Sequence, residues 1–309
     1  MKTALRFLTA FALVGAVACG GHNNGASTST SGAAKPASNR KAIGVTLLTQ
    51  THPFYKALEA AVRSEAAAKG FDVVVVACEF DPAKQASQIE DFVAQHVAAI
   101  LVAPCDSDAI VPALAGPERA GIPVFTADIA AHGGAVVSHV ASDNVQGGGL
   151  AADALAGFMG GKGKVIIIDH PTVASVQDRV KGFEDAMKKY PGITIVAKPS
   201  ADGQRAKATQ VMEDMLQAHH DITGVFGVND DSALGALGVV TAAGRKDIVI
   251  VGFDATDEEQ AAIKSGGPLK ASVVQYPSKI GQTVVDLIAD KLAGKSVPTS
   301  VALDVGLVK

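Results

Sequence analysis

Short apolar runs alternate with amphipathic stretches along most of the chain from residue 41 onward. The runs are continuously apolar rather than alternating in polarity, which is typical of parallel strands buried on both faces. The stretches between them repeat apolar residues at helical spacing and predict helices that cover a sheet. This order predicts two successive series of strands and helices, an α/β fold. The predicted strands are residues 42–48, 72–77, 99–103, 123–126, 165–168, 193–197, 224–226 and 249–252.

Capping residues predict where several helices begin and end. Pro53 opens the first helix and Gly70 ends it, because proline suits the first turn and glycine suits the residue after the last turn. Asp81, followed by a proline, caps the second helix. Ser175 with Asp178 resembles a capping box for a later helix.

Polar and aromatic residues follow the carboxyl ends of several predicted strands. In open α/β sheets ligands bind beyond these ends, so such residues are candidates for a binding site. Carboxylates accept hydrogen bonds from hydroxyl groups, asparagine donates and accepts, and an aromatic ring can cover the C–H face of a sugar. This chemistry predicts a site for a neutral polyhydroxylated molecule. The residues are His52, Phe54, Tyr55, Asp128, Asn229 and Asp254.

The sequence contains VSHVASDN at residues 137–144, NDDSALGA at residues 229–236 and VGFD at residues 251–254. These three separated motifs resemble the ribose-binding protein family of periplasmic sugar receptors. The resemblance runs essentially from residue 41 to the last residue. It implies two Rossmann-like lobes with parallel sheets, joined by three crossings near Ser142, near Gln275 and near residues 299–302.

The resemblance also implies how the chain is divided and what it does. We expect an N-terminal lobe of residues 41–142 plus 276–300 and a C-terminal lobe of residues 143–275 plus 301–309. Members of the family capture a sugar for an ABC importer. The expected partners are therefore a small sugar or polyol and an ABC permease in the inner membrane. The protein would act as a monomer, without a cofactor or a metal ion.

The family's ligand contacts are carried over one residue at a time onto matching positions. Phe54 and Tyr55 match an aromatic pair that stacks on the sugar, and Asp128 matches a carboxylate that binds hydroxyl groups. Other matches lie in the second lobe and at the hinge. The predicted ligand-binding residues are His52, Phe54, Tyr55, Asp128, Arg179, Asn229, Asp254 and Gln275.

Several positions depart from the family's pattern. His52 and Ala103 stand where asparagines are expected, Ile129 where an arginine is, and Gly203 where an aromatic residue is. The arginine's charge-assisted hydrogen bond alone would be worth roughly 1.5–3 kcal/mol. We therefore predict that the ligand is a sugar or polyol other than ribose, with a nucleoside or another solute as the alternative. A competing explanation is that His170 moves into the space at Gly203.

Each assignment has a purely structural alternative. Arg179 could form an ion pair on a helix surface, and Phe54 could belong to the core. Asn229 and Asp254 could cap the helices that follow them. Asp230 and the aspartate after it are interpreted as first-turn carboxylates of a helix rather than as ligand groups.

The N-terminal residues predict export and a lipid anchor. Lys2 and Arg6 precede an apolar run that is too short to span a bilayer, which is typical of a signal peptide over residues 1–18. The run ends in small residues before Cys19, as in a lipobox, although cleavage without lipid is the alternative. Residues 19–40 would then be a lipidated cysteine and a flexible tether reaching roughly 25 Å. The expected location is the periplasm or cell envelope.

Charge and cysteine content narrow the picture further. The net charge is −4, and basic residues do not cluster, so no nucleic-acid partner is expected. Apart from Cys19, the chain has Cys78 and Cys105. Each ends a predicted strand, with another strand expected between them. We therefore favour two unpaired thiols over a disulfide.

The motifs of common enzyme classes are absent from the sequence. It has no GxSxG elbow, no GxxxxGK[ST] loop, no GxGxxG after a strand, no CxxC pair and no HExxH. We therefore expect a binding protein rather than an enzyme. A lactose-repressor-type regulator would need an N-terminal helix-turn-helix in place of the predicted signal peptide. A receptor that serves a chemoreceptor or sensor kinase remains an alternative to the importer.

Overall fold

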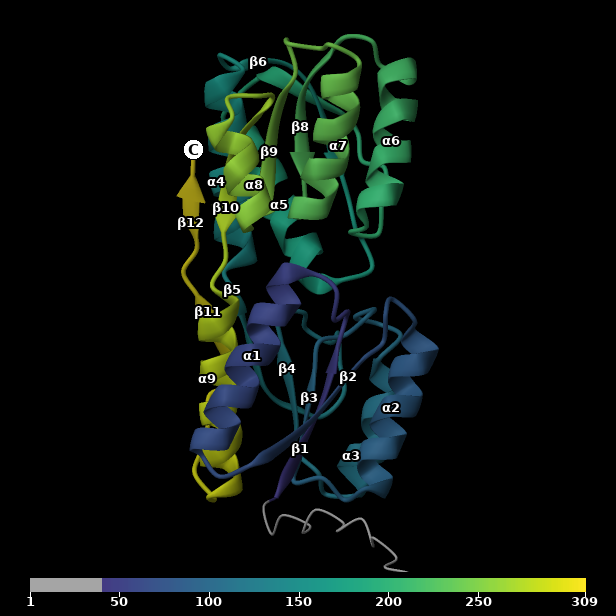
Figure 1. The fold of residues 1–309 in the computed structure, drawn as a ribbon, viewed down its shortest axis with the longest axis vertical. Coiled ribbons are helices and arrows are strands. Elements are labelled where there is room, and N and C mark those ends of the chain that lie inside the picture. Colours follow the sequence, from purple (N-terminus) through teal and green to yellow (C-terminus); the bar gives the residue numbers. More distant parts are fainter. Residues whose placement is uncertain (1–40) are drawn as a thin grey trace, which may run out of the picture. The chain divides into compact units, whose positions relative to one another are not determined.

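Two six-stranded sheets organise residues 41–309, the part of the chain that the computed structural model describes (Figure 1). The first sheet has the strand order β11-β5-β4-β3-β1-β2, and its neighbouring strands are parallel. Its strands are β1 (Ala42–Leu47), β2 (Asp72–Ala77), β3 (Ala99–Val102), β4 (Val124–Ala127), β5 (Val136–Ser142) and β11 (Ser300–Leu303).

The second sheet repeats this plan with the order β12-β10-β9-β8-β6-β7. Its pairs are parallel except for the edge pair of β10 with β12. The predicted α/β fold with parallel sheets is therefore confirmed. The strands are β6 (Lys162–Ile168), β7 (Gly192–Ala197), β8 (Ile222–Gly227), β9 (Val249–Asp254), β10 (Leu269–Val274) and β12 (Gly306–Val308).

Helices cover both faces of each sheet, and we call each sheet with its helices the first and second lobe. In the first lobe α1 and α9 pack together on one face, and α2 and α3 pack on the other (Figure 1). In the second lobe α4 and α5 form one layer, and α6 and α7 another. The helices are α1 (Pro53–Ala68), α2 (Pro82–Ala94), the 3₁₀ turn η1 (Val111–Leu114), α3 (Ala115–Arg119), α4 (Asn144–Phe158), α5 (Ala174–Met187), α6 (Arg205–Ala218), α7 (Asp230–Ala242), α8 (Asp257–Lys264) and α9 (Pro277–Leu292).

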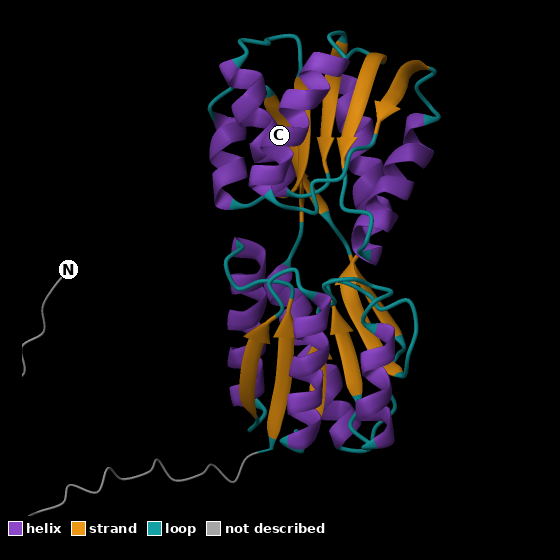
Figure 2. Cartoon of the chain, turned by 90° about the vertical axis from the view of Figure 1, so that its right-hand side faces the viewer, coloured by secondary structure: helices purple, strands orange, loops and turns teal. Residues whose placement is uncertain are grey.

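The chain passes between the lobes three times. It leaves β5 for α4, leaves β10 for α9, which packs beside α1, and leaves β11 for β12. The last passage follows Leu303, later than the expected boundary at residue 300, because Val301 and Ala302 still pair with β5. The carboxyl ends of the strands in the two sheets point toward each other (Figure 2).

The caps of the first two helices are those predicted. Asp81 Oδ1 accepts hydrogen bonds from the backbone N–H groups of Ala83 and Lys84, at 2.9 and 3.1 Å. Pro53 is the first residue of α1, and the chain leaves that helix through Gly70 at φ +81°. A positive φ is easy for glycine because it has no Cβ, which explains the stop at this residue.

The predicted capping box at Ser175 is wrong. With Ser175 as its cap the helix would begin at residue 176, but it begins two residues earlier, at Ala174, so Ser175 lies inside α5. The Ala174 N–H instead donates to Ser107 Oγ of the first lobe, at 2.9 Å. Ser107 N also donates to Thr172 O at 3.0 Å. A residue distant in sequence thus replaces the local cap and joins the two lobes.

The expectation of two unpaired thiols is also wrong, because Cys78 and Cys105 form a disulfide. As expected, β1 lies between the strands that precede them. Both cysteines, however, lie beyond the end of β1, and their Cα atoms are 6.6 Å apart. Their sulfur atoms lie 3.5 and 4.0 Å from the carbonyl oxygen of Leu48. The loops after β2 and β3 can therefore meet across the end of the intervening strand.

The predicted signal peptide, the lipid site at Cys19 and the tether of residues 19–40 lie outside the described residues. Within the described part of the chain, no helix combines the length and apolar character needed to cross a membrane.

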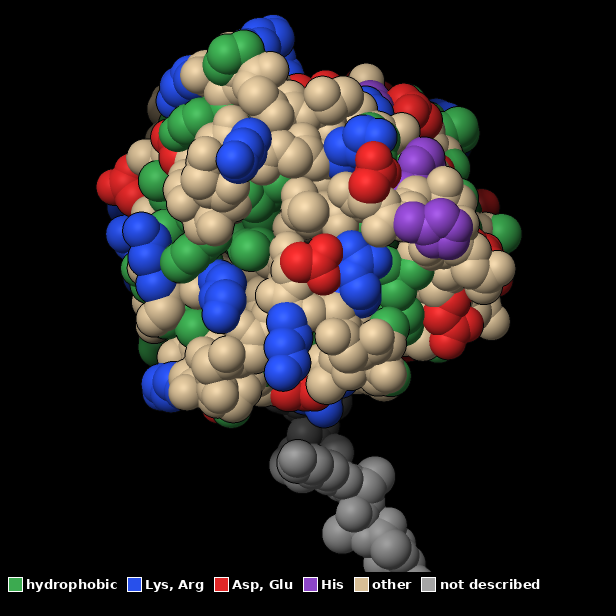
Figure 3. Space-filling model, turned by 90° about the horizontal axis from the view of Figure 1, so that it is seen from above, with side chains coloured by type: hydrophobic (Ala, Val, Ile, Leu, Met, Phe, Trp, Pro, Cys, Tyr) green, Lys and Arg blue, Asp and Glu red, His purple; other side chains and the backbone are tan. Residues whose placement is uncertain are grey.

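Acidic and basic side chains are interspersed on the face shown in Figure 3. Surface ion pairs of this kind join Lys164 to Asp221 at 2.5 Å and Arg245 to Asp247 at 2.7 Å. Such alternation of charge is the ordinary pattern of a solvated protein surface.

Candidate functional site

A cavity lies where the carboxyl ends of strands from both sheets meet. The volume of the cavity that the centre of a water molecule can reach is about 50 Å³. The structure brings every predicted ligand-binding residue to its wall, namely His52, Phe54, Tyr55, Asp128, Arg179, Asn229, Asp254 and Gln275.

The start of α1 presents an aromatic pair to the cavity. Phe54 and Tyr55 are each 5% exposed, and their rings meet edge to face with centroids 5.2 Å apart. Both residues also pack in the hydrophobic core. Phe54 is therefore a core residue and a residue of the cavity wall at the same time. Tyr55 therefore offers a rigid apolar face next to a polar group.

Asp128 follows β4 and adopts φ +66°, a left-handed conformation that turns the chain at the cavity. Its Oδ2 accepts a 2.6 Å hydrogen bond from the Tyr55 hydroxyl. Burial raises the pKa of Asp128, although the charge of Arg179 and the bond from Tyr55 oppose the shift. Burial and the Asp128 carboxylate raise the pKa of Tyr55 well above its ordinary value, so that the hydroxyl remains a donor.

Arg179 is buried rather than paired on the helix surface. Its Nε donates to Asn144 Oδ1 and its Nη1 to Val228 O, both at 2.8 Å. The guanidinium carbon lies 3.9 Å from the centre of the Phe253 ring, a cation–π contact. Nη1 is also 4.0 Å from Asp254 Oδ1, so the guanidinium faces the acidic side of the cavity.

Asp254 ends β9 and does not cap the helix after it. Its side chain is 6% exposed, and its Oδ1 accepts a 2.6 Å bond from Gln275 Nε2. Burial, and next the charge of Asp230, raise the pKa of Asp254 from 3.8 to about 6. Gln275 Oε1 is buried and has no hydrogen-bond partner within residues 41–309. A buried acceptor without a partner is costly, so this oxygen is suited to a donor from a ligand.

Asn229 combines two of the roles considered for it. Its Oδ1 caps α7 by accepting from Ser232 N at 2.9 Å, and its Nδ2 donates to Gly203 O at 3.0 Å. The side chain still lines the cavity. The helix cap is therefore observed, while a ligand contact by Asn229 remains a prediction.

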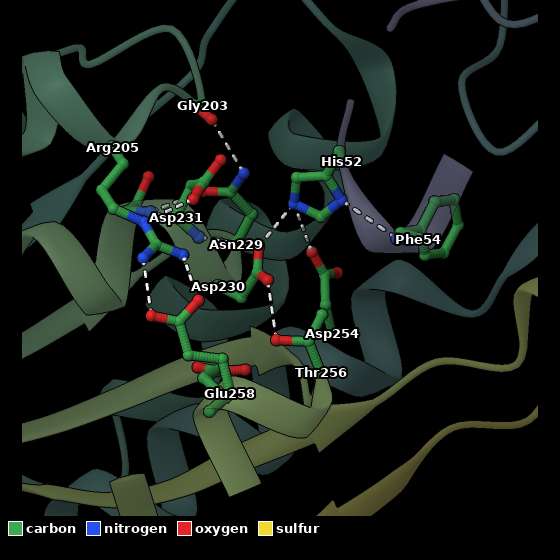
Figure 4. A network of polar contacts seen from close by, with 12 residues as sticks. His52, Phe54, Gly203, Arg205, Asn229, Asp230, Asp231, Asp254, Thr256 and Glu258 are labelled. Carbon is green, nitrogen blue, oxygen red and sulfur yellow. Dashed lines mark hydrogen bonds and ion pairs between the residues drawn. The ribbon is translucent and has the colours of Figure 1, made fainter. Parts of the chain in front are cut away.

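The structure revises the interpretation of Asp230. It is 1% exposed, and its Oδ1 lies 2.6 Å from His52 Nε2 of the first lobe (Figure 4). Its Oδ2 accepts a 2.8 Å bond from the Thr256 hydroxyl. Asp230 does begin α7, but its carboxylate bridges the lobes rather than serving only the helix end.

His52 is consequently bound on both ring nitrogens. Nδ1 accepts from Phe54 N at 3.2 Å, which caps α1, while Nε2 faces Asp230 and lies 4.0 Å from Asp254 Oδ2. Burial lowers the pKa of His52, but the hydrogen bond and charge of Asp230, with the charges of Asp254 and Asp231, raise it to about 9. The ion pair of His52 with Asp230 thus joins the two lobes.

One group among residues 41–309 has the spacing of a metal site. Ligand atoms of His52, Asp230 and Asp231 lie within 4.8 Å of one another. His52 and Asp230 already bind each other, and Asp231 Oδ1 accepts a 2.7 Å bond from Arg205 Nε. Arg205 also forms a bidentate pair with Glu258 (Figure 4). These cations neutralise the carboxylates, so the cluster is an ion-pair network.

Not all of the positions that depart from the family pattern lie in the wall of the cavity. Ile129 is 2% exposed and lines the cavity, whereas Ala103 is not part of its wall. At Gly203, which has φ +66°, an added Cβ would lie 3.0 Å from His170 Nδ1. His170 therefore occupies the space next to Gly203, and burial lowers its pKa to about 4, which keeps the imidazole neutral.

Sequence reasoning missed part of the apolar wall, most notably Phe80 after β2 and Val173 before α5. The rule that ligands bind beyond strand ends would have identified Phe80, because it lies just past the carboxyl end of a predicted strand. Val173 carried no comparable signal in the sequence.

Comparison with known proteins gives consistent matches. A family model described as "Periplasmic binding protein domain" matches residues 43–296. The ribose import binding protein of Bacillus subtilis is 38% identical over 274 residues, covering 87% of this chain and 88% of the relative. The D-apiose import binding protein of Actinobacillus succinogenes is 34% identical over 237 residues, covering 75% and 76%.

Solved structures have the same architecture. The structure of an ABC transporter solute binding protein from Agrobacterium vitis, bound with α-D-tagatopyranose, aligns with a TM-score of 0.83 and 31% identity. The alignment covers 87% of this chain and 94% of that protein. This chain is thus similar to proteins of transport systems over nearly all of its described length.

Proposed function

We propose, since the chain belongs to the periplasmic binding protein family, that it is the solute-binding component of an ABC-type importer. We propose further that it acts as a monomer and binds a sugar or sugar-like polyol other than ribose in the cavity between the lobes. Its relatives are binding proteins of transport systems, which supports a role in capture rather than catalysis.

The polar groups of the cavity carry the proposal. The unpartnered Gln275 Oε1 and the carboxylates of Asp128 and Asp254 are acceptors, and Arg179 is the charged donor. Acceptors in excess of donors suit a ligand that brings hydroxyl groups. The apolar faces of Phe54 and its neighbours suit the C–H side of the same ligand. A neutral polyol meets both requirements.

The choice against ribose rests on Ile129. A buried isoleucine stands where the family pattern has an arginine, so one charged donor is replaced by an apolar wall. The three relatives named above carry ribose, D-apiose and tagatopyranose in their descriptions, so the same fold accommodates different sugars.

A ligand panel tests the proposal. We expect D-apiose, D-tagatose, xylitol, myo-inositol or D-allose to raise the melting temperature more than D-ribose does. A ligand at 100 times its Kd adds about 2.7 kcal/mol, or roughly 5–10 °C for a chain of this size. Adenosine serves as the nucleoside control.

Titration calorimetry then ranks the affinities. Ribose binding tighter than every other compound would refute the exclusion of ribose, and a response to adenosine alone would refute the polyol class.

We also propose that the protein is exported and anchored through lipidated Cys19, which the short apolar run and the small residues before this cysteine support. Cys19→Ala should move the protein from the membrane fraction to the soluble periplasmic fraction, because a single segment of this length cannot anchor the mature chain. Radiolabelled palmitate measures acylation directly. Labelling that is absent in the wild type would contradict the anchor and leave the binding proposal intact.

A pull-down from detergent-solubilised membranes separates the importer from the alternative partner class. Recovery of an ABC permease supports transport, whereas recovery of a chemoreceptor or sensor kinase in its place would assign the protein to sensing.

A further inference from the structure

The disulfide lies directly behind the wall of the cavity. Cys78 and Cys105 are 0% and 5% exposed, and both sulfur atoms approach the carbonyl oxygen of Leu48, a residue that lines the cavity. The bond joins the loop after β2 to the loop after β3, and the two cysteines are 27 positions apart in the sequence. It therefore fixes the start of the loop that carries Phe80.

The two residues after Cys78 have an unusual backbone. Glu79 and Phe80 adopt φ 52° and φ 63°, so two successive residues with side chains are left-handed. Each such residue is destabilising in a free chain, and such a turn persists only where its surroundings hold it. Strained turns of this kind gather at sites that bind ligands.

Contacts on both sides hold this turn. Before it, Cys78 N donates to Leu47 O at 2.9 Å, and after it, Asp81 N donates to Cys78 O at 3.2 Å. The Glu79 carboxylate accepts from Thr49 Oγ1 at 2.7 Å and from Gln50 N at 3.1 Å. The turn is thereby tied to the loop after β1, which contributes Thr49 to the cavity.

The held turn places the half-buried Phe80 ring in the wall of the cavity. The second lobe has no aromatic side chain at Gly203, where an added Cβ would lie 3.0 Å from His170 Nδ1. Phe80 thus adds an aromatic face to those of Phe54 and Tyr55. It comes from the end of β2, where no ligand-binding residue was predicted.

We propose that Phe80 contacts the ligand and determines specificity, and that the Cys78–Cys105 disulfide holds its ring in place. This inference rests on the proposed function of the cavity. Phe80 would select ligands with an exposed C–H face, since an aromatic ring packs on that face and not on hydroxyl groups. Reduction of the disulfide would release the turn and weaken binding of such ligands.

A single-tryptophan variant tests the position of the ring without any ligand. The chain contains no tryptophan, so Phe80→Trp introduces one fluorophore at the cavity. Tris(2-carboxyethyl)phosphine reduces the disulfide to two thiols, while water supplies two protons and the oxygen that converts the phosphine to its oxide. We expect the emission to shift to longer wavelength on reduction, because the indole becomes more exposed to water.

Phe71→Trp is the matched control for this measurement. Phe71 lies just before β2, at the opposite end of the strand from Phe80. It packs against the same hydrophobic core as Phe80 and does not line the cavity. Its emission should not change on reduction. An unchanged emission of Phe80→Trp in protein whose thiols are shown to be free by alkylation would overturn the role of the disulfide.

Affinity measurements test the contact itself. Calorimetry with D-apiose, D-tagatose, xylitol and myo-inositol should show at least a ten-fold loss for Phe80→Ala and a smaller loss for Phe80→Leu. Phe71→Ala should bind as the wild type does. Reduction should weaken the wild type by a similar factor and have little further effect on Phe80→Ala, because both changes remove one interaction.

The outcomes are distinguishable from failure of the proposed function. Wild-type affinity in Phe80→Ala, or equal sensitivity of Phe80→Ala and the wild type to reduction, would overturn the inference while leaving the polyol site in place. If reduced protein unfolds, the Cys78→Ser, Cys105→Ser variant is compared with the same variant carrying Phe80→Ala, and additive losses overturn the coupling. If the wild type binds none of the compounds, the proposed ligand class fails, and the fluorescence comparison still decides whether the disulfide holds residue 80.

Discussion

Asp254→Ala should reduce affinity for the cognate polyol by about 10–100-fold, since a lost charge-assisted hydrogen bond is worth roughly 1.5–3 kcal/mol. The carboxylate is buried, accepts from Gln275 Nε2 and lies 4.0 Å from Arg179 Nη1. Its removal strands the Gln275 donor and leaves the Arg179 charge without its neighbouring carboxylate. Titration calorimetry measures the loss. Asp257→Ala, an exposed carboxylate at the start of α8, is the control and should bind normally.

Asp254 should lower the free energy of unfolding when no ligand is bound. Its pKa in the folded protein, about 6, is above the ordinary 3.8, so the charged form is disfavoured by folding. The penalty is absent below about pH 4, develops as the pH rises to 6, and persists above it; it amounts to about 2–3 kcal/mol. Asp254→Asn should therefore raise the free energy of unfolding at pH 7.5 in urea while weakening binding. Loss of both stability and affinity would indicate that Asp254 is structural.

The stability of the wild-type protein should fall as the pH rises from 6.5 to 9, because His52 then loses its proton. Asp230 raises the pKa of His52 in the folded protein from 6.5 to about 9. When folding raises a pKa, the resulting stabilisation is fully present below the pKa of the unfolded state. It is lost as the pH rises through the pKa of the folded state. A shift of this size corresponds to about 3 kcal/mol, most of which should be lost between pH 6.5 and 9.

Urea unfolding at intervals from pH 6 to 9.5 measures this dependence. His52→Gln should remove it, since glutamine keeps a polar side chain without the titration. His139 and His170 do not contribute, because burial lowers the pKa of each to about 4. A flat wild-type profile would show that the pair is not charged. Since His52 and Asp230 lie on different lobes, ligand affinity should decline over the same pH range.

Local sequence determined most of the cavity wall and eight of the strands in residues 41–309, whereas β5, β10, β11 and β12 were not predicted. The continuous apolar runs could only be buried on both faces, and they form the central strands β1, β3, β8 and β9. Residues just beyond parallel strands must gather at one edge of a sheet, which is why Asp128 and Asp254 could be assigned in advance. Gln275 and Arg179 were accessible only through the resemblance to a family, since neither carries a local signal of its own.

Tertiary structure decided which partners those residues meet. Asp230 was interpreted as an ordinary helix-start carboxylate because its partner, His52, is 178 residues away in the sequence. Likewise, the cap of α5 comes from Ser107, and the disulfide crosses the end of β1. Periodicity and caps express interactions within a few residues, so sequence by itself determined the elements and their order. Contacts between the lobes depend on how two separately formed sheets approach each other, and only the folded structure determines them.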